Sequence, residues 1–236
     1  MVSLYKGNTK IRDTGSFGVY KGNTPIKRIY KGSQLVYQFE SYTPNQDVVN
    51  ISNGQTATMN FKKGVYHIYA QGGGGGGGNW NYWNNGGGGG SGAGFDGYIV
   101  FPEDFGNVSC TTGSAPNANT DGIATIISGI FNLGGGKRGV SNGAGAGGTY
   151  SYTSGAGYYI LSSTVASNGT AGTSDPSAAG FGYGANSVLT GTGRNPSGGG
   201  AATALGAGGT GGNTSINTGG KGSGGQCVIT YIRYEV

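Results

Sequence analysis

Residues 72–78 are seven consecutive glycines. A run without side chains has no apolar surface to bury, and glycine loses more conformational freedom on folding than any other residue. Such a run can be ordered only where the missing side chains let neighbouring backbones approach closely. Glycine supplies 56 of the 236 residues, against a usual share of roughly 7%, and all but five of these glycines lie after residue 46.

Intrinsic disorder is the simplest alternative for such a composition, and two features argue against it. Chains that stay unfolded combine few apolar residues with a high net charge, whereas this chain has a net charge of +5 and 11% aromatic residues. The glycine runs also lie between segments rich in β-branched and aromatic residues, which are typical of strands: Thr56–Phe61, Val65–Ala70 and Gln226–Val236. The sequence therefore predicts an ordered glycine-rich domain.

Polyglycine can form an extended helix like polyproline II, with three residues per turn and no internal hydrogen bonds. Because a lone helix of this kind leaves every N–H and C=O without a partner, several must pack side by side. Five tracts could do so, and none has the strict G-X-Y period of collagen: Gly72–Gly78, Gly86–Gly94, Gly134–Gly148, Gly198–Gly212 and Gly219–Gly225. We therefore predict an all-β fold, in which N-terminal β-hairpin repeats precede a glycine-rich β-sandwich with a polyglycine II helix bundle.

The N-terminal segment contains a repeat that begins Tyr-Lys-Gly, at Tyr5, Tyr20 and Tyr30. Glycine supplies the positive φ that tight hairpin turns require, so each repeat predicts a hairpin. The clearest strands expected here are Ile26–Tyr30 and Leu35–Phe39. A meander this short buries little surface alone, so residues 1–44 are expected to pair with neighbours as an attachment or oligomerisation segment, and residues 45–236 to form the glycine-rich domain.

Strands in the second domain are expected near residues 48–52, 56–61, 65–70, 96–101, 107–112, 122–131 and 226–235, with a further one at 158–165. Asp121–Phe131 could also be read as a helix, but its isoleucines and threonine favour a strand.

The basic excess lies entirely in the N-terminal segment. The first 46 residues carry seven Lys or Arg and two Asp or Glu, whereas the rest of the chain carries seven of each. Lys6, Lys21 and Lys31 each precede a glycine, so we interpret them as solvated turn residues and expect no nucleic-acid partner. No apolar run is long enough to span a membrane, and membrane insertion is not expected.

Neither the cysteines nor the ionisable residues form a recognisable catalytic or metal site. Cys110 and Cys227 match no metal spacing, and we expect two buried free thiols, with a disulfide between two strands as the alternative. The sole histidine, His67, reads as a strand residue, and the adjacent Glu103 and Asp104 point apart on an extended chain. Gly-Lys pairs at Lys137 and Lys221 lack the Ser or Thr of a phosphate loop. We expect no enzyme activity, cofactor or metal.

One segment between two glycine runs holds both tryptophans of the chain. Aromatic and amide side chains combine flat apolar area with hydrogen bonding, which suits contacts to sugars and proteins. The alternative is that the tryptophans pack over the sandwich. The binding candidates are Asn79, Trp80, Asn81, Tyr82 and Trp83, with a second cluster that includes Tyr150 and Tyr152 and to which the same two interpretations apply.

The order of parts in residues 47–236 resembles the glycine-rich domain of bacteriophage tail fibres and related virion appendages. The matching pattern is a strand pair with a turn at Phe61–Gln71, a long glycine run, further Gly-Gly-Gly tracts, and a closing strand at Gly225–Tyr231. The domain is more distantly similar to the receptor-tip adhesins of T-even phages. The N-terminal segment Ile26–Tyr37 is similar to repeats in appendage proteins of phages that infect Bacteroidetes, including the crAss-like group.

This resemblance implies a structural virion protein, exposed on the particle surface after assembly in the host cytoplasm. The N-terminal segment would bind other virion proteins, and the glycine-rich domain would bind a host surface glycan or outer-membrane protein; a homo-trimer is expected. The alternative is a capsid, head-fibre or tail-assembly protein without a receptor. Candidate attachment residues are Tyr20, Ile26, Ile29, Tyr30, Val36 and Tyr37.

Overall fold

The computed structural model describes two units of the chain, Met1–Ser41 and Tyr42–Val236. Up to residue 44 it describes only the strand residues 5–6, 9–10, 20–21, 24–25, 28–31 and 34–38, and from residue 45 onward it describes all but 82–84, 156, 176–180, 214, 216 and 234–236. The described residues form strands, turns and extended segments, and none lies in an α-helix.

The first unit contains three antiparallel hairpins, one at each Tyr-Lys-Gly repeat. They are β1 (Tyr5–Lys6) with β2 (Thr9–Lys10), β3 (Tyr20–Lys21) with β4 (Thr24–Pro25), and β5 (Arg28–Lys31) with β6 (Gln34–Gln38). The innermost pairs are Lys6 with Thr9, Lys21 with Thr24, and Lys31 with Gln34. Each pair encloses two residues that begin with the repeat's glycine, so the predicted hairpins are confirmed.

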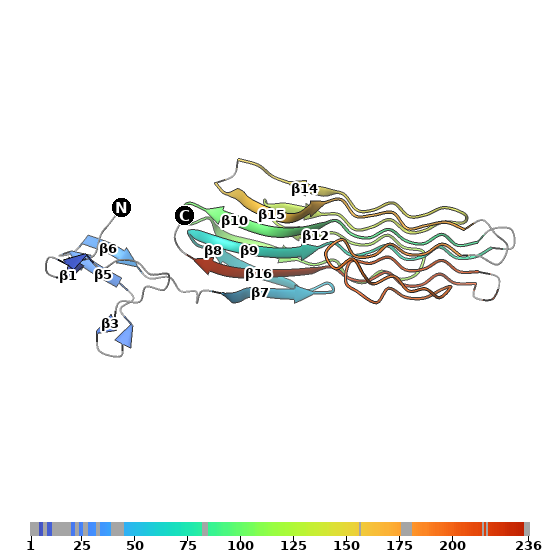
Figure 1. The fold of residues 1–236 in the computed structure, drawn as a ribbon, viewed down its shortest axis with the longest axis horizontal. Coiled ribbons are helices and arrows are strands. Elements are labelled where there is room, and N and C mark those ends of the chain that lie inside the picture. Colours follow the sequence, from blue (N-terminus) through green and yellow to red (C-terminus); the bar gives the residue numbers. More distant parts are fainter. Residues whose placement is uncertain are drawn as a thin grey trace. The chain divides into compact units, whose positions relative to one another are not determined.

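The second unit is built on two five-stranded antiparallel sheets, which confirms the prediction of an all-β fold (Figure 1). The first sheet has the order β15 (Tyr159–Ser167), β10 (Gly94–Phe101), β9 (Gly64–Gln71), β16 (Gln226–Arg233) and β7 (Gln46–Ser52). The second has the order β14 (Tyr150–Tyr152), β13 (Phe131–Leu133), β12 (Thr125–Ile127), β11 (Gly106–Thr111) and β8 (Thr56–Phe61).

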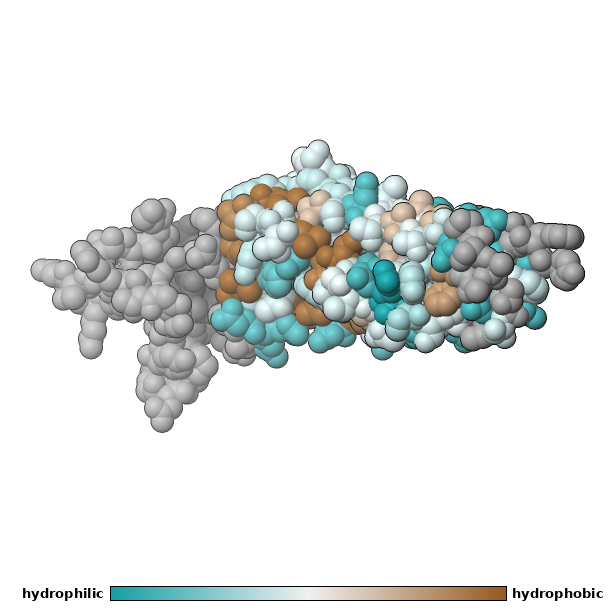
Figure 2. All heavy atoms as spheres, turned by 45° about the vertical axis from the view of Figure 1, so that its right-hand side comes forward, coloured by the Kyte–Doolittle hydropathy of each residue, from teal (hydrophilic) through white to brown (hydrophobic). Residues whose placement is uncertain are grey.

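Alternating residues of both sheets form one hydrophobic core, as expected for a β-sandwich. Its aromatic centre includes Phe61 stacked on Phe101 with ring centroids 4.5 Å apart, and Tyr66 edge-on to both rings. Residues from both sheets contribute to the buried cluster, including Val108 of β11 and Ile229 of β16. Hydrophobic residues on the face shown in Figure 2 gather toward the sheets rather than toward the far end of the glycine tracts.

Both cysteines lie in this core as free thiols, Cys110 on β11 and Cys227 on β16. They come from different sheets, so their contact crosses the sandwich. Interaction with the neighbouring Cys110 thiol, together with burial, raises the pKa of Cys227.

The prediction of one strand over residues 122–131 is wrong, because the segment folds back on itself. Ile127 pairs with Phe131, and the Ile130 N–H donates to the Ile127 carbonyl at 2.9 Å. Gly129, with a φ of 74°, supplies the left-handed conformation of this turn. The segment therefore forms β12 and β13, and the short strand β14, which we did not predict, pairs with β13.

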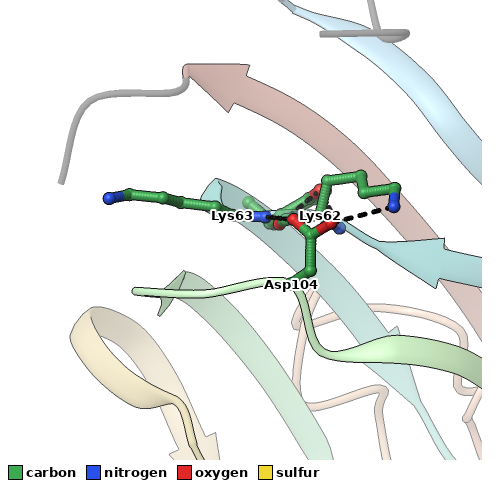
Figure 3. A network of polar contacts seen from close by, with 4 residues as sticks. Lys62, Lys63 and Asp104 are labelled. Carbon is green, nitrogen blue, oxygen red and sulfur yellow. Dashed lines mark hydrogen bonds and ion pairs between the residues drawn. The ribbon is translucent and has the colours of Figure 1, made fainter. Parts of the chain in front are cut away.

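Asp104 bonds to the turn between β8 and β9, and we call its contacts with Lys62 and Lys63 the polar clamp. Asp104 accepts a hydrogen bond from the Lys63 backbone N–H at 3.0 Å and from the Lys62 ammonium at 2.9 Å. Figure 3 shows that the Lys63 side chain extends away from Asp104, so Lys63 contributes its backbone rather than its charge to this clamp. These contacts, led by the Lys63 N–H, hold the pKa of Asp104 below its usual value.

The glycine tracts run side by side from the sheets, and their backbone groups bond to one another and to neighbouring extended segments (Figure 1). Within 72–78, every third N–H donates to the same neighbour. The N–H groups of Gly72, Gly75 and Gly78 donate to residues 93, 90 and 87; those of Gly73 and Gly76 to residues 123 and 120; and those of Gly74 and Gly77 to residues 223 and 220. One run therefore bonds to three neighbouring segments, each antiparallel to it.

These segments lie too close together for side chains at most contact positions. A Cβ at Gly74 would lie 1.9 Å from the Ala207 carbonyl oxygen, and one at Gly89 would lie 2.1 Å from the Gly75 oxygen. Real Cβ atoms essentially never come within 3.0 Å of another heavy atom. The predicted reason for the glycine runs, close approach between backbones, is therefore met in the structure.

Candidate binding site at the end of the glycine tracts

The described residues 79–81 and 85 lie where two glycine tracts meet, away from the sheets. Strands β9 and β10 are paired, with Gln71 opposite Gly94, and the hydrogen bonds of Gly72, Gly75 and Gly78 continue this pairing outward. The described connecting residues 79–81 and 85 therefore lie at the far end of the tracts from the sandwich (Figure 1).

Two other connections meet these residues, and we call the described residues of 79–85, 140–143 and 213–219 the tip loops. The Trp80 N–H donates to the Asn217 carbonyl at 3.0 Å, and the Gly219 N–H donates to Asn79 Oδ1 at 3.0 Å. On the other side, the Asn81 amide donates to Ser141 Oγ at 3.1 Å. Segments more than 130 residues apart in the chain are therefore joined at the tip.

The loop 140–143 is a tight turn whose local sequence explains its geometry. Val140 and Gly143 exchange both backbone hydrogen bonds, at 2.9 and 3.0 Å, across Ser141 and Asn142. Asn142 has a φ of 55°, a left-handed conformation that asparagine tolerates better than most residues. Its side chain accepts from the Asn85 N–H at 3.1 Å, and its own N–H donates to the Asn85 carbonyl at 2.7 Å.

The described residues of the tip loops carry amides, hydroxyls and apolar groups, and none of them is charged. Asn79 and Asn81 are exposed, Trp80 is half-buried, and Val140 is one of the most exposed large apolar residues of the described chain. Such a surface offers hydrogen bonds and flat apolar area without a strong electric field. The predicted residues Tyr82 and Trp83 lie outside the described residues.

Beside the tip loops lies a group that sequence reasoning missed. The Arg194 guanidinium carbon lies over the ring of Tyr183, 3.9 Å from its centre, and Phe181 packs edge-on against Tyr183 with centroids 5.2 Å apart. Phe181 and Asn213 of the tip both approach Gly198, at 3.1 and 3.2 Å from the position of its Cβ. In the sequence, the aromatic residues between glycines at 180–184 could have indicated this group.

The structure places Tyr150 and Tyr152 on β14, in the sandwich and not among the tip loops (Figure 1). Both are half-buried, and their rings lie 6.0 and 5.5 Å from that of Phe131. Burial and the neighbouring Tyr152 raise the pKa of Tyr150. These contacts favour the packing interpretation for the two tyrosines, and a binding role for them stays a prediction.

The attachment candidates fall on the hairpins of the first unit. Tyr20 lies on β3, Ile29 and Tyr30 on β5, and Val36 and Tyr37 on β6, where Ile29 pairs with Tyr37. Ile26 lies outside the described residues.

Ionisable side chains form few clusters in the described part of the chain. His67 Nε2 and Asp96 Oδ1 lie 2.6 Å apart, and Asp96 Oδ2 also accepts from the Thr164 hydroxyl at 2.8 Å. Among the described residues, no group of three His, Cys, Asp or Glu side chains could hold a metal ion, and no helix is long and apolar enough to cross a membrane.

A scan against models of known protein families and a search of curated protein sequences found no match to this chain.

Proposed function

We propose that the glycine tracts form a bundle of polyglycine II helices. The hydrogen-bond direction of Gly72–Gly78 repeats every three residues, which is the period of this helix. The run 86–93 supports the same geometry, because Gly86, Gly89 and Gly92 donate to residues 212, 209 and 206, while Gly87 and Gly90 donate to residues 140 and 137. A β-strand would direct its N–H groups to opposite sides in turn instead.

We infer that the protein is a structural component of a phage virion, a tail-fibre or appendage protein whose glycine-rich domain binds a host surface receptor. The observation that carries this proposal is the joining of three loops at the end of a hydrogen-bonded scaffold. Because the tracts are held by backbone hydrogen bonds to one another and to neighbouring segments, the scaffold can present loops whose side chains vary without changing the fold.

The chemistry of the tip loops favours a surface glycan as the receptor. Asn79 and Asn81 are exposed amides beside the indole of Trp80, and sugars offer hydroxyl groups to amides and a flat C–H face to aromatic rings. An outer-membrane protein is the other receptor class. Residues 1–44 attach the protein to other virion proteins, and the particle carries it as a homo-trimer on its surface, without catalysis.

The receptor proposal is tested by adsorption of virions to host cells. We expect Trp80→Ala combined with Trp83→Ala to reduce adsorption at least tenfold while leaving the protein in the particle. Tyr98→Ala is the matched control, because Tyr98 is an exposed aromatic residue, 40% accessible, on strand β10 of the sandwich. Unchanged adsorption of intact virions with the tryptophan variant contradicts a receptor site at the tip.

One observation favours the alternative of a capsid, head-fibre or tail-assembly protein without a receptor. Several tip amides already bond to other residues of the protein: Asn79 accepts from Gly219, Asn81 donates to Ser141, and Asn85 donates to the carbonyl of Asp175 at 3.2 Å. If this alternative holds, purified protein will not bind host cells or compete with virions for them. Deleting residues 1–44 tests attachment to the virion separately from receptor binding. We expect that variant to be absent from particles, whether or not the protein binds a receptor.

A further inference from the structure

One long stretch of the second unit, residues 139–174, carries no charged residue, and we call its part beyond the tip loops, residues 144–174, the uncharged flank. The stretch lies between Arg138 and Asp175 and contains no Asp, Glu, Lys, Arg or His. At the chain's average of 10% charged residues, a stretch of this length would carry several. The flank includes β14, β15 and the glycine-rich segments that flank them.

Strand β15 of the flank is exposed, although it lacks charge. In β15 only Ile160 and Val165 are half-buried, and the other seven residues are exposed. Tyr159 and Leu161 are 46% and 52% accessible, which places them among the most exposed large apolar side chains of the described residues. Exposed apolar groups gathered on one surface often mark an interaction site.

Two strand edges lie together on this side of the sandwich. β15 ends the order of the first sheet and β14 ends that of the second, and no described strand pairs with the outer edge of either. Phe95 of β10, the strand next to β15, stacks on Tyr150 of β14 with centroids 6.4 Å apart, so the β15 end of one sheet and the β14 end of the other lie on the same side of the sandwich (Figure 1).

Natural proteins guard exposed strand edges with charged residues or proline, since an open edge is a template for pairing. β7, the opposite edge of the first sheet, carries Asp47. β15 carries neither a charge nor a proline over nine residues. The pairing of β15 with β10 contains two register shifts, so the outer edge of β15 is not regular over its whole length. We therefore expect a partner to contact β15 through side-chain packing and a short hydrogen-bonded ladder, and not through one continuous ladder.

We propose that the uncharged flank is the surface through which copies of this chain associate. A side chain near a rotation axis lies close to its own symmetry copies, so a charged residue there would face the same charge. A flank without charges removes this repulsion. It also offers no complementary charge to an acidic or basic partner, whereas a second copy presents the same neutral, partly apolar surface.

This inference rests on the proposed assembly of several copies, but not on receptor binding. Its test is the molar mass of the full chain, measured by light scattering and sedimentation at micromolar concentration. We expect an oligomer for the natural chain and at least a tenfold weaker association for Leu161→Lys combined with Ser163→Lys. Gln46→Lys combined with Asn50→Lys adds the same charge at exposed positions of β7 and is expected to leave the mass unchanged.

Cysteine cross-linking keeps the inference testable if the lysine variant misfolds. Ser163→Cys is expected to form disulfide-linked copies under air oxidation, while Asn50→Cys is not. The proposal is overturned if the natural chain is monomeric, or if the folded lysine variant keeps its mass and Ser163→Cys does not cross-link. If the folded lysine variant keeps its oligomeric mass and Ser163→Cys does not cross-link, the homo-trimer still stands but its contacts lie on another surface. Adsorption to host cells tests the receptor proposal separately.

Discussion

Replacing Gly74 with alanine should destabilise the second unit far more than the same change at its neighbour Gly73. A Cβ at Gly74 would lie 1.9 Å from the Ala207 carbonyl oxygen and 2.3 Å from its carbon. A Cβ at Gly73 would have its nearest atom, the Ser223 carbonyl oxygen, at 3.1 Å. The two variants share a tract and a chemical change, so they differ mainly in the space available.

The expected cost of Gly74→Ala is about 3 kcal/mol. The new methyl group falls roughly 1.5 Å short of an ordinary contact of about 3.5 Å, so the segments must separate. Overpacking costs about 1–3 kcal/mol, and the bonds at risk, Gly74 N–H to Ser223 and Ser223 N–H to Ala207, contribute about 1 kcal/mol each. Restricting the unfolded chain returns about 0.5–1 kcal/mol. For Gly73→Ala, where a shift of a few tenths of an ångström suffices, we expect a change within about 1 kcal/mol.

Urea unfolding measures both variants, and tryptophan fluorescence suits the purpose because the chain has only two tryptophans, Trp80 and Trp83, and Trp80 lies at the far end of the glycine tracts. Equal midpoints for the two variants, or a stable Gly74→Ala protein, would refute the reasoning that backbone contact is what requires glycine here.

Three further predictions concern the sandwich and its edge. The Tyr158 hydroxyl donates to the Gly129 carbonyl at 2.8 Å, and burial, aided by Tyr152, raises the pKa of Tyr158 to about 12. The natural chain should therefore lose stability as pH rises from about 10 toward 12. Tyr158→Phe should show less of this loss and cost about 1 kcal/mol near neutral pH, as measured by unfolding at each pH. The pKa of Asp104 is lowered, so its stabilising contribution is present above about pH 4 and is lost as pH falls through the folded value; unfolding of Asp104→Asn should depend less on pH between about 5 and 2, and an unchanged slope contradicts the clamp. Leu161→Lys alone should change the free energy of unfolding of the monomer by no more than about 0.5 kcal/mol, because the residue is exposed. A larger loss of stability would show that Leu161 supports the fold rather than an interface.

The strands of the second unit were predictable because alternating apolar residues identify them directly. β8 begins and ends where expected, and β9 and β10 differ from expectation by two residues or fewer at each end. The error at 122–131 arose from Gly129, whose turn is hidden among isoleucines that favour a strand on either side of it.

The partners of the glycine tracts could not be predicted, because a residue without a side chain carries no information about its neighbour. One neighbour of the run 72–78 was missed altogether. Residues 117–123 bond to Gly73 and Gly76, yet they contain a single glycine, Gly122, whose Cβ would lie 2.3 Å from the Gly73 carbonyl oxygen. An outer segment needs glycine only where it faces the tracts, and its other side chains, such as Asp121 and Thr120, are exposed.

For a similar reason, the candidate site could be predicted only in part. A loop between two glycine runs must lie at an end of the tracts, which located Asn79 and Trp80. Its contacts with Ser141 and Asn217 depend on how the distant tracts pack, and no residue pattern near Trp80 reports that packing.

Amide hydrogen exchange at Gly72–Gly78 tests the central claim, a glycine run ordered by hydrogen bonds to three neighbouring segments. The account predicts that all seven N–H groups are protected to a degree similar to those of β9, because each donates to another segment. Exchange of these seven amides at the rates of an unstructured peptide, with β9 still protected, would contradict it.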